Sequence, residues 1–173
     1  MTEPDVDYHR EKYGLVALAH YLTDVEGWPT VRLSVAAESL DALGGMNGLL
    51  PPMIDPERDR ADSRYRYVFY TDIGGRIDLV AAKPGHALLV EAKGRSAKVQ
   101  AGIEQLIGRT MLSIEPGRLD RSYAILIPDL PSWMRVVQTA RHSALSQIGV
   151  YTVSPNGVIG RCAWGGEPLP QPR

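Results

Sequence analysis

The sequence contains almost no cysteine: Cys162 is the one cysteine among 173 residues. A single thiol cannot close an internal disulfide, and it cannot supply a zinc cage built from several thiolates. The N-terminal segment lacks the charged-then-apolar pattern of a signal peptide, and no apolar run approaches the roughly 20 residues of a membrane-spanning helix. We therefore expect a cytoplasmic protein with no membrane partner.

An excess of charge of one sign is also missing. The chain has 19 Lys and Arg against 20 Asp and Glu, which gives a formal net charge of -1. No global basic surplus indicates a nucleic-acid partner. A local basic patch stays open, because a run of basic residues occupies the middle of the chain: Arg95, Lys98, Arg109, Arg118 and Arg121.

The bulk composition is ordinary for a globular protein, with 44% hydrophobic and 23% charged residues. The length is sufficient for one domain with a sizeable core. We expect a single domain over residues 1–164, in which residues 44–62 form a long loop or insertion. The Pro- and Gly-rich tail over residues 165–173 is expected to be extended or disordered.

Hydrophobic periodicity predicts strands that alternate with helices. The expected elements, in chain order, are a helix from about Tyr8 to Val25, a strand over Thr30–Val35, a short helix over Ala36–Leu43, an aromatic strand over Tyr65–Tyr70, strands over Arg76–Val80 and Ala87–Val90, a helix from Ser96 to about Ile114, a strand over Tyr123–Ile127, a helix over Pro131–Gln147 capped by Gly149, and paired strands over Val150–Val153 and Val158–Arg161. This order indicates the α/β class, with a central mixed sheet and helices on both faces.

Two segments keep alternatives open. The long loop at 44–62 is either a lid or binding arm, or a mobile insertion without a role. The aromatic strand over Tyr65–Tyr70 could stack on nucleic-acid bases, or it could be an ordinary edge or core strand.

Acidic and basic side chains gather around one expected hairpin. Glu91-Ala92-Lys93 follows the apolar run Ala87–Val90, and strand geometry places Glu91 and Lys93 on the same side. Asp78 lies in the preceding strand, and the segment between the two strands has turn chemistry. Pairing would bring Asp78 beside Glu91, which makes a plausible site for a hard divalent cation.

A further carboxylate is expected on the first helix. Stepping back four residues from Leu15 leads to Glu11, so Glu11 would lie on the apolar face near the start of the helix. The alternative is that Glu11 lies at the edge of this face and is solvated. In the helix after the hairpin, Gln105 and Arg109 are spaced one turn apart.

This pattern resembles the PD-(D/E)xK nuclease superfamily, which has the restriction-endonuclease-like fold, and in particular its RecB-like or resolvase-like branches. The resemblance covers roughly Glu11 to Val153, although the motif itself is a few residues. Two features depart from the family: Ile77 stands where the name-giving proline would be, and a long segment separates the first strand from Asp78. The proline is often missing in the superfamily, and the long segment leaves the branch open.

The resemblance implies a role for each matching residue. Asp78 and Glu91 look like the metal-binding carboxylates, with the Ala92 carbonyl as a further ligand, and Lys93 looks like the lysine that positions the attacking water. Glu11 looks like the helix-borne acid that extends the metal site, and Gln105 is similar to a glutamine of the RecB-like branches.

The function implied by the resemblance is a nuclease that uses Mg²⁺ or Mn²⁺ to hydrolyse phosphodiester bonds of DNA, with a homodimer as a further possibility. One alternative is a catalytically inactive nuclease fold that serves as a binding or accessory module. Another is a small α/β domain in which Glu91 and Lys93 form a structural ion pair. Other motifs are poorer: the four histidines have no zinc spacing, His86 is expected on the surface, and Ser122 has no nucleophile-elbow context.

Overall fold

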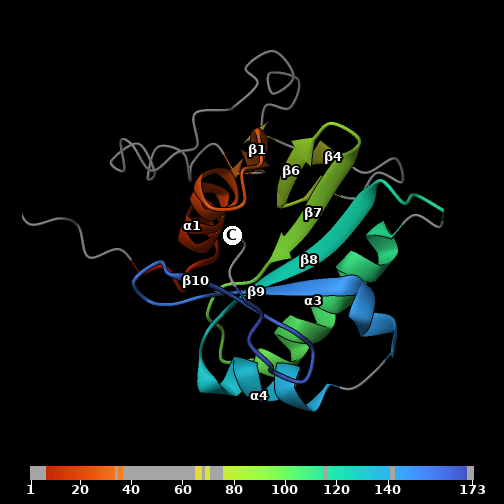
Figure 1. Ribbon diagram of the computed structural model, residues 1–173. Helices are drawn as coiled ribbons and strands as arrows, with labels where there is room; N and C mark the ends of the chain where they lie inside the picture. Colours follow the sequence, from red (N-terminus) through yellow and green to blue (C-terminus); the bar gives the residue numbers. More distant parts are fainter. Residues whose placement is uncertain are drawn as a thin grey trace, which may run out of the picture.

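The centre of the protein is a mixed six-stranded sheet with the order β1-β6-β7-β8-β9-β10, as Figure 1 shows for the computed structural model. The structure describes residues 7–33, 35–36, 65–67, 69–70, 76–114, 117–140 and 143–170. The strands of this sheet are β1 Thr30–Leu33, β6 Leu79–Lys83, β7 His86–Ala92, β8 Arg121–Pro128, β9 Ile148–Val153 and β10 Ile159–Cys162. Strands β7, β8 and β9 are parallel, and the other pairs are antiparallel. The predicted mixed sheet is confirmed.

Helices cover both faces of the sheet, as predicted, so the α/β class is confirmed. Helix α1 (Glu11–Asp24) packs on one face, and helices α3 (Val99–Ser113) and α4 (Pro131–Thr139) pack on the other (Figure 1). A short 3₁₀ helix, η2 (Ser143–Gln147), precedes β9. None of the helices in the described ranges is long and apolar enough to cross a membrane.

Side chains alternate between the two faces along each central strand. In β7, Leu88, Val90 and Ala92 belong to the cluster around α1. In β8, Ile125 and Ile127 belong to the cluster around α3 and α4. Because successive strand residues point to opposite faces, Glu91 is directed toward the α3 side.

Four short strands form two smaller sheets. Strand β2 (Val35–Ala36) pairs with β3 (Tyr65–Tyr67), and β4 (Phe69–Tyr70) pairs with β5 (Arg76–Ile77). The predicted aromatic strand is therefore found as β3 and β4. Of the short helix expected over residues 36–43, Ala36 belongs to β2 and the rest lies outside the described residues, as does the 44–62 loop.

Several predicted boundaries were wrong, for identifiable reasons. Helix α3 begins at Val99, because the Ser96 hydroxyl accepts the N–H of Lys98 in a local turn before the helix. Helix α4 ends at Thr139, and η2 follows as a separate 3₁₀ helix. Gly149 does not cap a helix, because it pairs with Ala124 within the sheet.

Of the two alternatives predicted for the tail, extended or disordered, residues 165–170 agree with the first, since they lie along the sheet. The chain turns at Gly165 and returns along β10, where the Leu169 N–H donates to the Arg161 carbonyl at 2.9 Å. The Gly165 N–H donates to the Val137 carbonyl at 3.0 Å, which ties the turn to α4. The edge strand β10 offers backbone acceptors, and these hold the tail despite its prolines. Residues 171–173 lie outside the described residues.

Candidate active site

The hairpin of β6 and β7 brings Asp78 and Glu91 together. The register of the two strands ends at the pair of Leu79 and Val90, and the Asp78 carboxylate then accepts the N–H of Ala92, the residue after Glu91. The turn between the strands contains Gly85 at φ +73°, a backbone conformation that favours glycine. The predicted hairpin is confirmed.

Asp78 lies at a bend between β5 and β6, rather than inside the continuous strand predicted over residues 76–80. Strand β5 leaves β7 here and pairs with β4 instead. The carboxylate of Asp78 accepts the backbone N–H of Ala92 at 2.9 Å. The side chain therefore supplies the acceptor that a continuing strand would have provided through its backbone.

Both carboxylates are withdrawn from water: Asp78 and Glu91 are each 2% exposed. On the α3 side of the sheet, Arg109 Nη1 lies 3.7 Å from Glu91 Oε2. This distance corresponds to an ion pair that is longer than a hydrogen bond. The guanidinium side chain is 47% exposed, so Arg109 stands between the buried carboxylate and the solvent.

Lys93 continues the strand geometry beyond the end of β7. Its backbone N–H donates to the Leu126 carbonyl at 3.0 Å, which extends the ladder between β7 and β8. The spacing of two residues therefore places the half-buried Lys93 side chain on the same face as Glu91.

The backbone of Ala92 faces Asp78. Its N–H points toward the Asp78 carboxylate, and the carbonyl of a strand residue points to the same side as its N–H. Two carboxylates and a carbonyl are the hard oxygen donors that Mg²⁺ and Mn²⁺ prefer, and Mg²⁺ commonly uses one or two carboxylates with water in the remaining positions. The donor set at the end of this hairpin therefore fits a divalent cation.

Glu11 lies beside this site. It is the first residue of α1, and a Cβ added to Gly94 would lie 2.5 Å from the Glu11 backbone nitrogen and 3.0 Å from the His9 carbonyl oxygen. Gly94 thus allows the start of α1 to approach the chain just after Lys93. Across the described ranges, no three His, Cys, Asp or Glu side chains form a group that could hold a metal, so Glu11 does not complete a three-carboxylate set with Asp78 and Glu91.

Gln105 is exposed on α3, one turn before Arg109. Residues four apart lie on the same helix face, so Gln105 and Arg109 share the side of α3 that reaches Glu91. Gln105 is therefore placed at the rim of the site.

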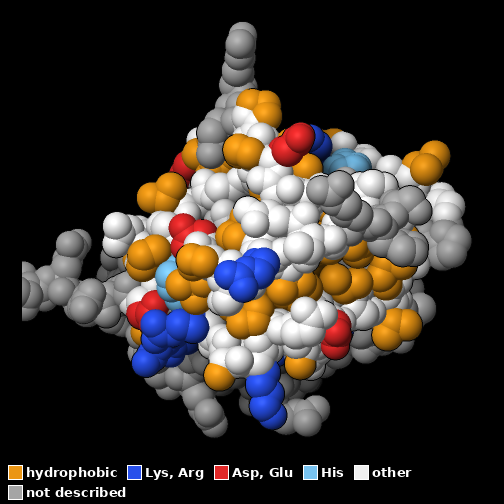
Figure 2. Space-filling model, turned by 90° about the horizontal axis from the view of Figure 1, so that it is seen from below, with side chains coloured by type: hydrophobic (Ala, Val, Ile, Leu, Met, Phe, Trp, Pro, Cys, Tyr) orange, Lys and Arg blue, Asp and Glu red, His pale blue; other side chains and the backbone are white. Residues whose placement is uncertain are grey.

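The basic residues for which a local patch was left open are divided between two ends of the sheet. Arg95 and Lys98 are exposed just beyond the carboxyl end of β7. Arg121 pairs with Ala87 at the other end of β7, and the adjacent Arg118 is paired with Asp120 at 2.9 Å. The five residues therefore do not form one patch. Figure 2 shows one group of Lys and Arg side chains at the lower left of the face seen from below and others apart from it, at the centre and the bottom edge.

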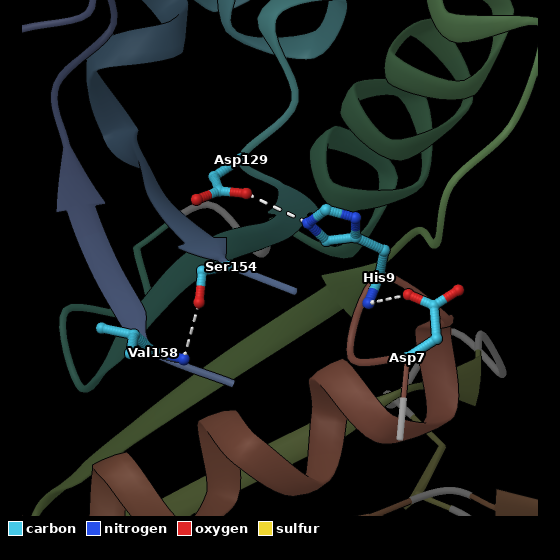
Figure 3. A network of polar contacts seen from close by, with 5 residues as sticks. All are labelled: Asp7, His9, Asp129, Ser154 and Val158. Carbon is cyan, nitrogen blue, oxygen red and sulfur yellow. Dashed lines mark hydrogen bonds and ion pairs between the residues drawn. The ribbon is translucent and has the colours of Figure 1, made fainter. Parts of the chain in front are cut away.

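Sequence reasoning missed a polar network at the carboxyl ends of the parallel strands (Figure 3). We call the pair of His9 and Asp129 the clasp: His9 Nε2 lies 3.0 Å from Asp129 Oδ1, and His9 is 6% exposed. The His9 carbonyl accepts the Arg95 N–H at 2.7 Å, and the Arg95 guanidinium contacts Asp7 at 3.1 Å. The clasp ties the start of α1 to the loop after β8, and the Arg95 contacts tie it to the loop after β7.

The sequence contained a signal for one of the two clasp residues, Asp129. Asp129 directly follows the apolar run that forms β8, and the carboxyl ends of parallel strands meet at one edge of a sheet. His9 carried no such signal, because its contact with Asp129 spans 120 positions.

A half-buried acid, Glu26, lies past the C-terminal end of α1. We call Glu26, Trp28, Tyr151 and Arg161 the Glu26 cluster. The Glu26 carboxylate accepts the Tyr151 hydroxyl and the Trp28 indole N–H, each at 3.0 Å, and lies 3.7 Å from Arg161 Nη1. Burial, followed by the negative charge of Glu26, raises the pKa of Tyr151 above its usual value of 10.0.

The Glu26 cluster borders a cavity of about 300 Å³ that also contains Ser122. The Ser122 hydroxyl lies 2.7 Å from His86 Nε2, and the His86 ring lies 5.9 Å from the Trp28 ring. His86 is therefore half-buried rather than a plain surface residue.

No protein-family model matches this chain, and no curated protein matches it. The functional argument therefore depends on the geometry of the site.

Proposed function

We propose that the protein is a metal-dependent nuclease of the PD-(D/E)xK type that hydrolyses phosphodiester bonds of DNA, acting in the cytoplasm. One observation supports this most: Asp78 and Glu91, each 2% exposed, flank the last residue pair of the β6–β7 hairpin, and strand alternation puts Lys93 on the same face as Glu91. Two carboxylates that are withdrawn from water repel each other unless cations compensate them. A cation-binding role accounts for keeping both.

In this proposal Asp78, Glu91 and the Ala92 carbonyl hold a Mg²⁺ or Mn²⁺ ion, and Glu11 lies at the edge of the site. When bound, such an ion supplies a Lewis acid that polarises a phosphoryl oxygen and lowers the pKa of a water.

The other side chains act on the substrate and the attacking water. Lys93 orients the water with its ammonium and stabilises the negative charge that develops on the phosphate. The water oxygen attacks phosphorus and gives a proton to the solvent, the phosphorus–oxygen bond to the leaving group breaks, and the leaving oxygen gains a proton from the solvent. Gln105, at the rim, can donate to a phosphate oxygen.

A second candidate is an inactive nuclease fold that serves as a binding module. The contact between Arg109 and Glu91 favours it, because a resident guanidinium already compensates one carboxylate without a metal ion. The formal net charge of -1 also favours it. The two candidates differ in whether the site takes up a divalent cation and turns over substrate.

The test is cleavage of supercoiled plasmid, single-stranded DNA and branched DNA in Mg²⁺ or Mn²⁺. Wild type is expected to nick or cut at least one substrate in a metal-dependent way. Asp78→Ala and Lys93→Ala should each lower the rate by roughly two to three orders of magnitude, as is typical when a group that stabilises the transition state is removed.

Two substitutions serve as matched controls. Lys83→Ala removes an exposed lysine at the far end of the same hairpin, and Asp24→Ala removes an aspartate that is 69% exposed at the end of α1. Both should cut at the wild-type rate. Cutting that persists in Asp78→Ala and Lys93→Ala would place the activity elsewhere, and no cutting of any substrate would favour the binding module.

A further inference from the structure

Arg109 places a positive charge at the mouth of a site that we propose to bind a cation. Glu91 Oε2 lies 3.7 Å from Arg109 Nη1, and the two side chains are 3% and 47% exposed. A charge-assisted hydrogen bond would be about 2.7–2.9 Å long. The contact is thus electrostatic without the geometry that locks a guanidinium to a carboxylate, and water reaches the other side of the arginine.

The charges around the hairpin end are balanced without a metal ion. Asp78 and Glu91 are negative, and Lys93 and Arg109 are positive, so the four side chains sum to zero. A divalent cation at the carboxylates would raise the sum to about +2, with two like charges close to Glu91. The half-exposed guanidinium is the positive group with freedom to leave, because its long side chain extends toward solvent.

A guanidinium released in this way has an obvious partner in the substrate. Its planar array of donors matches the geometry of phosphate oxygens. Gln105 lies one turn away on the same helix face and offers a neutral donor beside it.

We propose that Arg109 is an internal counter-cation for the Asp78–Glu91 pair, which a divalent cation displaces from Glu91 toward a phosphate of the substrate. This inference rests on the proposed nuclease function and adds an order of events, in which the metal ion binds before the arginine contacts DNA. Metal and arginine compete for Glu91 in the free protein, and metal binding makes the arginine available for DNA.

The test is a calorimetric titration of the full chain with Mn²⁺ in the absence of DNA. Arg109→Gln removes the charge but keeps an amide donor near Glu91, and it should bind Mn²⁺ about tenfold more tightly than wild type, since an opposite charge at this distance changes such equilibria by a factor of ten or more. Arg109→Lys keeps the charge and should stay close to wild type. Arg135→Gln, which removes an exposed arginine on α4, is the matched control.

A second measurement follows the arginine to the substrate. In a Lys93→Ala background, in which cleavage is expected to be slow on the time scale of a binding measurement, adding Arg109→Gln should weaken binding of an oligonucleotide when Mn²⁺ is present. It should leave binding unchanged when Mn²⁺ is absent. The rise in melting temperature on adding Mn²⁺ should also be larger for Arg109→Gln than for wild type.

The outcomes separate the two proposals. If wild type takes up Mn²⁺ through Asp78 and cuts DNA, while Arg109→Gln binds Mn²⁺ no more tightly, the counter-cation proposal is wrong and the nuclease proposal stands. If neither wild type nor Arg109→Gln takes up Mn²⁺, both proposals are wrong. Tighter uptake by Arg109→Gln in a protein that cuts no DNA would support the counter-cation role and contradict the nuclease.

Discussion

Glu26 and Glu91 are both withdrawn from water, but they are held in different ways. The Glu26 side chain is 11% exposed and accepts two hydrogen bonds of 3.0 Å, from Tyr151 and Trp28. The Glu91 side chain is 3% exposed, and its contact with the Arg109 guanidinium is 3.7 Å long. Glu26 also has an arginine at that distance, whereas Glu91 lies near a second buried carboxylate, Asp78.

The difference shows how burial of the same residue type can serve two purposes. The donors around Glu26 come from three places: Trp28 in the segment after α1, Tyr151 in β9 and Arg161 in the edge strand β10. The Glu26 carboxylate therefore links separate elements of the fold. Glu91 lies near a second carboxylate and a half-exposed arginine, an arrangement in which an incoming cation can replace the arginine as the partner of the carboxylate. We therefore expect the Glu26 cluster to contribute to stability, and we propose metal binding for Glu91.

The largest expected contrast is in activity. Glu91→Gln should lower metal-dependent cleavage by roughly two to three orders of magnitude, because it removes a charge that holds the cation. Glu26→Gln should cut within a fewfold of the wild-type rate at temperatures where it is folded. Initial rates on the same plasmid, measured beside circular dichroism spectra, check this contrast. Equal losses in both variants would break the comparison.

The next contrast is in stability, where substitution of Glu26 should have a larger effect than substitution of Glu91. Glu26→Ala should lower the free energy of unfolding by about 3 kcal/mol, because it leaves buried donors and Arg161 without their acceptor. Glu91→Gln in metal-free protein should change it by less than about 1 kcal/mol, or raise it, since repulsion with Asp78 is relieved. Urea unfolding in the presence of a chelator measures both. A loss in Glu91→Gln as large as that in Glu26→Ala would favour the structural ion-pair alternative.

The backbone that supports the site can be tested with a glycine. Gly94→Ala would place a methyl group 2.5 Å from the Glu11 nitrogen, so the chain after Lys93 must separate from α1. We expect a loss of about 2 kcal/mol in the free energy of unfolding. Gly108→Ala is the matched control, because an added Cβ on that exposed helical glycine meets nothing within 4 Å and should stabilise by about 0.5 kcal/mol. Unchanged stability in Gly94→Ala would contradict the close packing of these segments.

The smallest expected effect is the alkaline pH dependence of the Glu26 cluster. Burial and Glu26 raise the pKa of Tyr151 in the folded state above 10.0, so the folded protein holds this proton more tightly than the unfolded chain. Its contribution to stability is complete below about pH 10 and is lost as the pH rises toward the folded-state pKa. Tyr151→Phe should therefore show a shallower decrease in melting temperature above pH 10. An identical decrease in both proteins would show that ionisation of Tyr151 does not contribute to the loss of stability above pH 10.

Local sequence signals predicted the sheet and the hairpin well. The apolar run before Glu91 and the turn at Pro84–Gly85 predicted the hairpin. The hydrophobic periodicity predicted the helices that begin at Val99 and Pro131. The predicted helix boundaries were wrong where local and long-range hydrogen bonds competed. Ser96 formed a local turn, and Gly149 joined the sheet.

The environment of the site was harder to predict. The contact of Arg109 with Glu91 and the contact of His9 with Asp129 join positions that are distant in the chain, and no periodicity encodes them. The folded tail depends on backbone groups of β10, whose availability follows from β10 being the last strand of the sheet.

The most direct test of the central claim is the stoichiometry of Mn²⁺ bound by wild type and by Asp78→Asn, measured by electron paramagnetic resonance. Asparagine can keep the acceptor for the Ala92 N–H, so the bend at this position should survive the substitution. We predict saturable uptake by wild type that is lost in Asp78→Asn while the far-ultraviolet circular dichroism spectrum stays the same. Equal uptake by both proteins, or none by wild type, would contradict the assignment of the Asp78–Glu91 pair as a metal site.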